Sequence, residues 1–98
     1  MINSIENDDF YQKMQNEKLT VLDVREKVEF IDGHVPMTQN WPLSELAEKY
    51  SKLDTSTSYY LICRSGARSA NACAFLQDKG LNVTNVTGGM LAWKGEVI

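Results

Sequence analysis

The chain has 98 residues, 43% of them hydrophobic and 23% charged, with a formal net charge of −3 at pH 7. This length supports one modest core, so we expect a single domain over residues 1–98, and the ordinary composition excludes disordered, collagen-like and coiled-coil chains. The mild acidity argues against nucleic acid as a partner.

The first half of the chain alternates helical and strand-like patterns. Residues 7–16 are predicted to form a helix because three apolar side chains share one face, with Asn7 or Asp8 as its N-cap. Residues 19–24 are a short apolar, β-branched run that predicts a buried strand. The elements expected next are a helical turn over residues 26–31, an irregular connection from His34, and a helix over residues 42–53.

The second half continues the same alternation. Its expected elements are a strand over residues 58–63, a helix over residues 67–79 ended by Gly80, a strand over residues 82–86, a break at Gly88 and Gly89, and a turn over residues 90–93. Strands that alternate with helices predict a parallel sheet with helices on both faces. Ligands of such sheets bind at the carboxyl ends of the strands, which directs attention to residues 23–25 and 63–69.

The two cysteines and the N-terminus indicate a cytoplasmic protein with reduced thiols. Cys63 and Cys73 are too few for the disulfide framework of a small secreted domain, and the residues after Met1 do not resemble a secretory signal. No apolar run approaches the roughly 18 residues that cross a membrane. The cysteines and the single histidine have no metal-ligand spacing, so we expect neither a membrane partner nor a metal site.

The charges are distributed unevenly along the chain. Residues 1–54 carry eleven acidic and six basic side chains, whereas residues 55–98 carry two acidic and four basic ones. Two explanations stay open at this point, namely chance in a short sequence and an anion-binding site in the second half.

The loop after Cys63 has features that activate a thiol. Cys63 closes a hydrophobic strand, Gly66 lies in the short turn, and Arg64 and Arg68 flank it. Backbone N–H groups of a tight strand-to-helix loop converge on an anion, and the helix dipole adds positive potential. An unperturbed cysteine is about 3% thiolate at pH 7, whereas a pKa about two units lower makes it mostly thiolate. The alternative is a cysteine that only packs at a strand end.

Residues 63–69 (Cys-Arg-Ser-Gly-Ala-Arg-Ser) resemble the active-site loop of rhodanese-like sulfurtransferases. Met37, Thr38 and Trp41 depart from the family pattern, and we expect them to alter the rim of the site rather than its chemistry. Further segments resemble the family in the same order along the chain, namely Leu22-Asp23-Val24-Arg25-Glu26 with Glu29-Phe30, Gly33-His34-Val35-Pro36 with Asn40, Pro42 and Leu43, and Gly88-Gly89-Met90 with Ala92-Trp93.

This resemblance implies a three-layer α/β fold with a mainly parallel sheet of about five strands. It implies that Cys63 attacks the outer sulfur of a small anionic donor such as thiosulfate, forms a persulfide, and passes the sulfur to cyanide, a thiol or a protein. No cofactor is implied. The expected persulfide-binding loop consists of Arg64, Ser65, Gly66, Ala67, Arg68 and Ser69, with Asp23 and Arg25 as supporting residues.

Three other functions could use a cysteine loop of this kind. Cysteine-dependent phosphatases use a Cys-x5-Arg loop, whereas Arg68 follows Cys63 in a Cys-x4-Arg arrangement. The loop is one residue shorter, so the space for an anion is narrower, which disfavours a phosphatase or an arsenate reductase. A regulatory interaction module without turnover often lacks the cysteine or its loop, and this chain keeps both. A sulfur carrier would form the same persulfide and deliver it to one specific protein.

Several other residues have both a chemical and a structural interpretation. Cys73 lies about 9 Å along the predicted helix, too far for a disulfide with Cys63, so we expect it to pack. His34 is expected to hold a turn rather than to form a Cys/His pair. Glu29 is expected to form an ion-paired scaffold with Asp23 and Arg25, and Phe75 and Trp93 are expected in the core.

Overall fold

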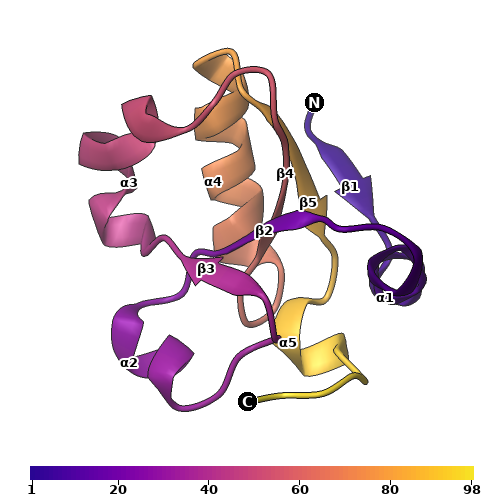
Figure 1. Cartoon of the computed structure of the whole chain (residues 1–98). Helices are drawn as coiled ribbons and strands as arrows, with labels where there is room; N and C mark the ends of the chain where they lie inside the picture. The colour runs from indigo at the N-terminus through magenta and orange to yellow at the C-terminus, as the bar shows by residue number, and fades with distance from the viewer.

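The computed structural model describes residues 1–98 and contains one five-stranded sheet (Figure 1). All neighbouring strands run parallel, in the order β1-β5-β4-β2-β3, which confirms the predicted sheet. The strands are β1 (Asn3–Ile5), β2 (Thr20–Asp23), β3 (Thr38–Asn40), β4 (Ser58–Ile62) and β5 (Asn82–Val86).

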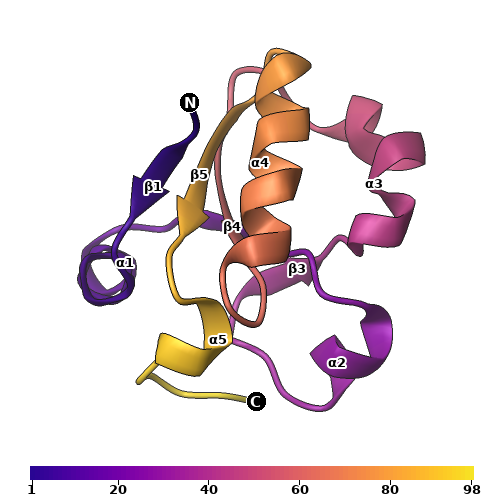
Figure 2. The same cartoon turned by 180° about the vertical axis from the view of Figure 1, so that it is seen from behind.

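Helices cover both faces of this sheet, as Figures 1 and 2 show from opposite sides. Helices α3 and α4 lie on one face, and α1 and α5 lie on the other. The helices are α1 (Asn7–Asn16), α2 (Lys27–Ile31), α3 (Leu43–Lys49), followed directly by the 3₁₀ helix η1 (Tyr50–Lys52), α4 (Ala67–Asp78) and α5 (Gly89–Ala92).

Two hydrophobic clusters, one on each face, hold the three layers together. Successive side chains of a strand point to opposite faces. Accordingly, Leu22 and Leu61 join the larger cluster beneath α3 and α4, whereas Val21 and Ile62 join the smaller one with Phe10 of α1. The continuous apolar runs in β2 and β4 are therefore explained by burial on both sides, as parallel sheets require.

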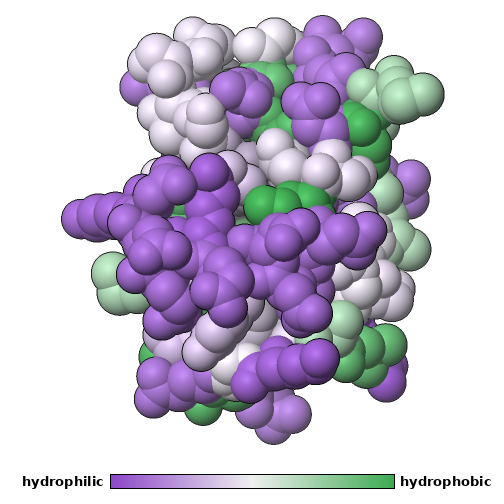
Figure 3. All heavy atoms as spheres, turned by 90° about the vertical axis from the view of Figure 1, so that its right-hand side faces the viewer, coloured by the Kyte–Doolittle hydropathy of each residue, from purple (hydrophilic) through white to green (hydrophobic).

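The outer side of α1 is polar. Figure 3 views the molecule from the right-hand side of Figure 1, where α1 lies, and shows a mainly hydrophilic face. Within α1, Asp8, Asp9 and Gln12 are exposed, while Phe10 is fully buried. The longest helix, α4, has 12 residues, and no helix combines the length and apolar character that crossing a membrane requires.

The structure differs from the sequence predictions at two short strands and one helix cap. Strands β1 and β3 were not predicted, because each has three residues, sits at an edge of the sheet and lacks apolar alternation. The predicted caps Asn7 and Asp8 were wrong, since Glu6 is the N-cap of α1. The buried Asn7 amide instead donates hydrogen bonds to distant carbonyl groups, which explains why it does not cap its own helix.

The backbone at Met37 is strained. Its φ of 70° is the only positive value at a non-glycine residue, and its side chain is 75% exposed. A left-handed conformation costs an L-residue about 1–2 kcal/mol, and part of this is regained with glycine.

We therefore expect Met37→Gly to stabilise the protein by about 0.5–1 kcal/mol, or roughly 2–8 °C in Tm. Thermal unfolding followed by circular dichroism measures this change. Gln39→Gly, at an exposed β3 position without positive φ, is the control and should lower the Tm. A lower Tm for Met37→Gly would contradict the predicted strain.

Candidate functional site

The candidate site lies at the carboxyl edge of the sheet, in the loop between β4 and α4. Cys63 follows the last residue of β4, and α4 begins at Ala67, so the turn is as short as the sequence predicted. Gly66 has a φ of 99°, and a Cβ atom there would lie 3.1 Å from the backbone nitrogen of Gly88. Both the backbone angle and the limited space therefore require glycine in this turn.

The Cys63 sulfur accepts hydrogen bonds from the loop that follows it. The backbone N–H groups of Gly66 and Ser69 lie 3.1 and 3.3 Å from Sγ, and the Ser69 hydroxyl oxygen lies 3.2 Å from it. Burial alone raises the pKa of the Cys63 thiol, but the hydrogen bonds from Ser69 and then Gly66 outweigh burial and lower the pKa below its ordinary value. The arrangement therefore favours a thiolate.

Helix α5 supports the cysteine loop through hydrogen bonds from its backbone. The N–H groups of Met90 and Leu91 donate to the carbonyl groups of Cys63 and Arg64, at 2.8 and 2.9 Å. Gly89 lies against the same carbonyls, with a φ of 52°, and a Cβ atom there would lie only 2.3 Å from the Cys63 oxygen. The start of α5 therefore fixes the position of the loop through backbone contacts.

We expect Gly89→Ala to lower the free energy of unfolding by about 2–5 kcal/mol, since positive φ and a backbone clash both oppose the methyl group. The matched control is Gly80→Ala, because Gly80 has a φ of 87° but open space around its Cβ position. This control should lose only about 1–2 kcal/mol. Urea unfolding of both variants measures the difference, and equal losses would show that the close approach at Gly89 is unimportant.

Arg68 forms an ion pair that ties the loop to α2. Its Nη1 and Nη2 atoms donate to the two carboxylate oxygens of Glu29, at 2.6 and 2.8 Å. The hydrogen bonds from Arg68 lower the pKa of Glu29 to about 2, so the pair stays ionised at neutral pH. Arg64 is exposed and forms no salt bridge. Of the two arginines expected to attract an anion, Arg64 alone therefore keeps an unpaired charge.

Asp23 and Arg25 form a second, buried ion pair beside the site. The Arg25 guanidinium donates to both Asp23 oxygens, with the shortest contact at 2.7 Å, and also donates to the carbonyl of Gly33 at 2.8 Å. Asp23 is fully buried and Arg25 is 7% exposed. Neither residue hydrogen-bonds the Cys63 sulfur. The pair links the end of β2 to the connection at Gly33, and Glu29 pairs with Arg68 instead of joining it.

Two buried asparagines support the surroundings of the site, in roles that were not predicted from the sequence. Asn85 of β5 accepts from the Ser69 hydroxyl at 2.5 Å and donates to the Gly66 carbonyl at 3.3 Å. Asn7 donates to the carbonyls of Thr87 and Gly89, both at 3.0 Å. Strand β5 reads Asn-Val-Thr-Asn-Val, and the one available signal was asparagine inside a strand, where this residue is uncommon.

The contacts of Cys73 and His34 indicate a structural role for both residues. Cys73 is buried and forms no disulfide, and burial raises the pKa of its thiol to about 12. The His34 ring stacks on Phe30 at 3.7 Å and its Nδ1 lies 2.8 Å from the Phe30 carbonyl oxygen. Its backbone also exchanges two hydrogen bonds with Ile98, so His34 joins the end of α2 to the C-terminal segment.

Phe75 and Trp93, both expected in the core, are only partly buried and pack against the edges of the two hydrophobic clusters. The Phe75 ring meets Tyr50 with 5.3 Å between the ring centroids. The Trp93 ring packs against the fully buried Phe10 ring in a tilted arrangement, with 5.8 Å between the centroids. No group of His, Cys, Asp and Glu side chains is arranged to hold a metal ion.

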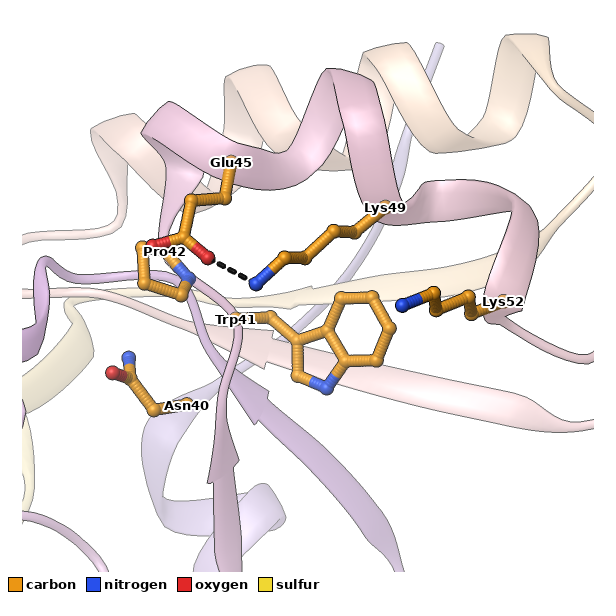
Figure 4. A pocket seen from close by; sticks show the side chains of 6 residues that line it. All are labelled: Asn40, Trp41, Pro42, Glu45, Lys49 and Lys52. Carbon is orange, nitrogen blue, oxygen red and sulfur yellow. Dashed lines mark hydrogen bonds and ion pairs between the residues drawn. The ribbon is translucent and has the colours of Figure 1, made fainter.

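A separate hollow of about 230 Å³ lies beside α3, and Figure 4 shows its lining. The Trp41 ring lies next to the side chains of Lys49 and Lys52, and Lys49 points toward Glu45. No residue of the cysteine loop lines this hollow, so it is not part of the candidate site.

Comparison with known proteins gives consistent matches along the chain. The model of the rhodanese-like domain family matches residues 6–96. YtwF of Bacillus subtilis is 42% identical over 81 residues, which cover 83% of this chain and 79% of that protein. A protein of Allochromatium vinosum named sulfurtransferase is 32% identical over 95 residues, which cover 95% of this chain and 89% of that protein. The crystal structure of a rhodanese-related protein from Thermoplasma volcanium has a TM-score of 0.89 and 40% sequence identity. The match covers 98% of this chain and 97% of that protein.

Proposed function

The chain belongs to the rhodanese-like domain family, and from this we propose that it is a sulfurtransferase in which Cys63 carries the transferred sulfur. The observation that carries the proposal is the set of donors around the Cys63 sulfur, from the backbone of Gly66 and from Ser69. These donors stabilise a thiolate before the reaction and a persulfide anion after it.

In the first half-reaction, the Cys63 thiolate attacks the outer sulfur of a donor such as thiosulfate. A new S–S bond forms to Cys63, and the S–S bond of the donor breaks. The electron pair of the broken bond leaves with sulfite, so the charges balance and Cys63 becomes a persulfide anion. The exposed Arg64, which follows Cys63 directly in the chain, raises the local concentration of such an anionic donor.

In the second half-reaction, a thiophilic acceptor attacks the outer sulfur of the persulfide. With cyanide, a C–S bond forms, thiocyanate leaves, and the electron pair of the S–S bond returns to Cys63 as the thiolate. A thiol or a protein acceptor follows the same course and receives the sulfur as its own persulfide. Neither step needs a metal or an organic cofactor, and we place the reaction in the cytoplasm, where thiols stay reduced.

The shape of the loop favours a single sulfur over a phosphate group. Four residues separate Cys63 from Arg68, and both terminal nitrogens of Arg68 are held by Glu29. A phosphatase needs an arginine that clasps the phosphate oxygens at this place. The narrow loop and the engaged guanidinium therefore support sulfur transfer.

Steady-state kinetics with thiosulfate and cyanide test the proposal. Because the persulfide forms before the acceptor binds, double-reciprocal plots at several cyanide concentrations should give parallel lines. Thiocyanate is measured as its coloured iron complex, and an aryl phosphate serves as the competing substrate. Absence of thiocyanate together with hydrolysis of the aryl phosphate would overturn the proposal.

A further inference from the structure

The Ser69 hydroxyl, next to the Cys63 sulfur, has more possible acceptors than it has protons. Its oxygen lies 2.5 Å from Asn85 Oδ1, 3.2 Å from Cys63 Sγ and 3.3 Å from the Gly66 carbonyl oxygen. A hydroxyl group donates one hydrogen bond and accepts up to two. The Ser69 hydroxyl can therefore donate its hydrogen bond to the Cys63 sulfur or to Asn85, but not to both at once.

The orientation of the Asn85 amide is fixed by its second neighbour. The Gly66 carbonyl oxygen can only accept, so the Asn85 Nδ2 group must face it, at 3.3 Å, and Oδ1 must then face Ser69. Asn85 is 5% exposed and Ser69 is fully buried, so water does not compete for these groups. The shortest contact in the cluster thus draws the Ser69 proton toward Asn85 and away from Cys63.

We propose that Asn85 is a positioning residue that holds the Ser69 hydroxyl proton while Cys63 is a thiol and releases it to the sulfur when the thiolate or persulfide forms. In the thiol state, the S–H group donates to Ser69 Oγ, and Ser69 donates to Asn85. When the thiol proton leaves to solvent, the Ser69 hydroxyl rotates and donates to the anionic sulfur, which is the stronger acceptor. The Ser69 proton stays on its own oxygen throughout.

This arrangement has a consequence for reactivity. Each thiolate that forms must first break the hydrogen bond between Ser69 and Asn85, so Asn85 restrains ionisation of Cys63. A thiol nucleophile works best when its pKa lies near the ambient pH, because a lower pKa also weakens the nucleophile. The inference rests on the proposed role of Cys63, and it adds a residue from β5 that sets how readily this thiol ionises.

The test is the pH dependence of Cys63 alkylation by iodoacetamide, which needs no sulfur donor and is therefore independent of the proposed transfer. In Asn85→Leu, the Ser69 hydroxyl is free to donate its hydrogen bond to the Cys63 sulfur. The midpoint of the pH profile of alkylation should therefore fall by roughly 0.5–1 pH unit. Below both midpoints, alkylation should then be roughly three- to tenfold faster than in the parent. The Gly66 carbonyl keeps its hydrogen bond from the Ala70 N–H in this variant.

A double-mutant cycle separates this role from simple support of the loop. In a Ser69→Ala background, Asn85→Leu should no longer move the midpoint, because the hydroxyl through which Asn85 acts is gone. A midpoint that rises or stays unchanged in Asn85→Leu, or that falls equally in both backgrounds, would overturn the proposal. Asn82→Leu makes the same change at an exposed position of β5 and should leave the midpoint in place. Asn85→Ala, with the same expected direction, replaces Asn85→Leu if that variant does not fold.

Discussion

Cys63→Ser should lower the rate of sulfur transfer from thiosulfate to cyanide by about a thousandfold or more. A serine hydroxyl at the same position in the loop does not ionise near neutral pH. Its oxygen also does not form the persulfide that both half-reactions require. The side chains are similar in size, so the fold should be retained. Thiocyanate production at saturating thiosulfate measures the effect.

Cys73→Ala is the matched control for this loss. Cys73 is the second cysteine, it lies on the buried face of α4 in the larger hydrophobic cluster, and burial raises the pKa of its thiol to about 12. Its variant should keep a rate within a few-fold of the parent. If Cys63→Ser retained activity and Cys73→Ala lost it, the nucleophile would have been assigned to the wrong thiol.

Asp23→Ala should cause the largest loss of stability, about 3–5 kcal/mol. It leaves the Arg25 guanidinium, whose side chain is 9% exposed, without its charged partner in a buried position. The change also removes the acceptor of the Arg25 backbone N–H group. For a domain of this length, such a loss corresponds to a decrease in Tm of more than about 12 °C.

The exposed ion pair of Lys13 and Glu17 provides the comparison for Asp23→Ala. The Glu17 side chain is 55% exposed, and exposed pairs contribute about 0–1 kcal/mol. Glu17→Ala should therefore change the Tm by only a few degrees. Similar losses for Asp23→Ala and Glu17→Ala would contradict the scaffold role assigned to the buried pair.

The central strands and the cysteine loop could be predicted from the sequence because their local signals agree with their surroundings. The apolar runs of β2 and β4 reflect burial on both faces of the sheet, and β5 matches its predicted range, residues 82–86. The turn after Cys63 combines a strand end, Gly66 and a helix start within four residues. Each of these features depends on neighbours in the sequence.

The features that escaped prediction depend on partners far along the chain. Strand β3 reads Thr-Gln-Asn and is ordered by pairing with β2, which no local pattern encodes. Asn85 reaches Ser69 across 16 positions, and Asn7 reaches Gly89 across 82. The pairing of Arg68 with Glu29, rather than with an anion, likewise required the packing of α2 against the loop. Tertiary hydrogen bonds of this kind follow only from the completed fold.

The most direct measurement of the central claim is the intact mass of the protein after incubation with thiosulfate and removal of small molecules. We predict that the parent gains the mass of one sulfur atom, that cyanide removes it, and that Cys63→Ser gains nothing. Peptide mapping should place the added sulfur on Cys63. An unchanged mass in the parent, or an equal gain in Cys63→Ser, would contradict the assignment of Cys63 as the persulfide-forming nucleophile.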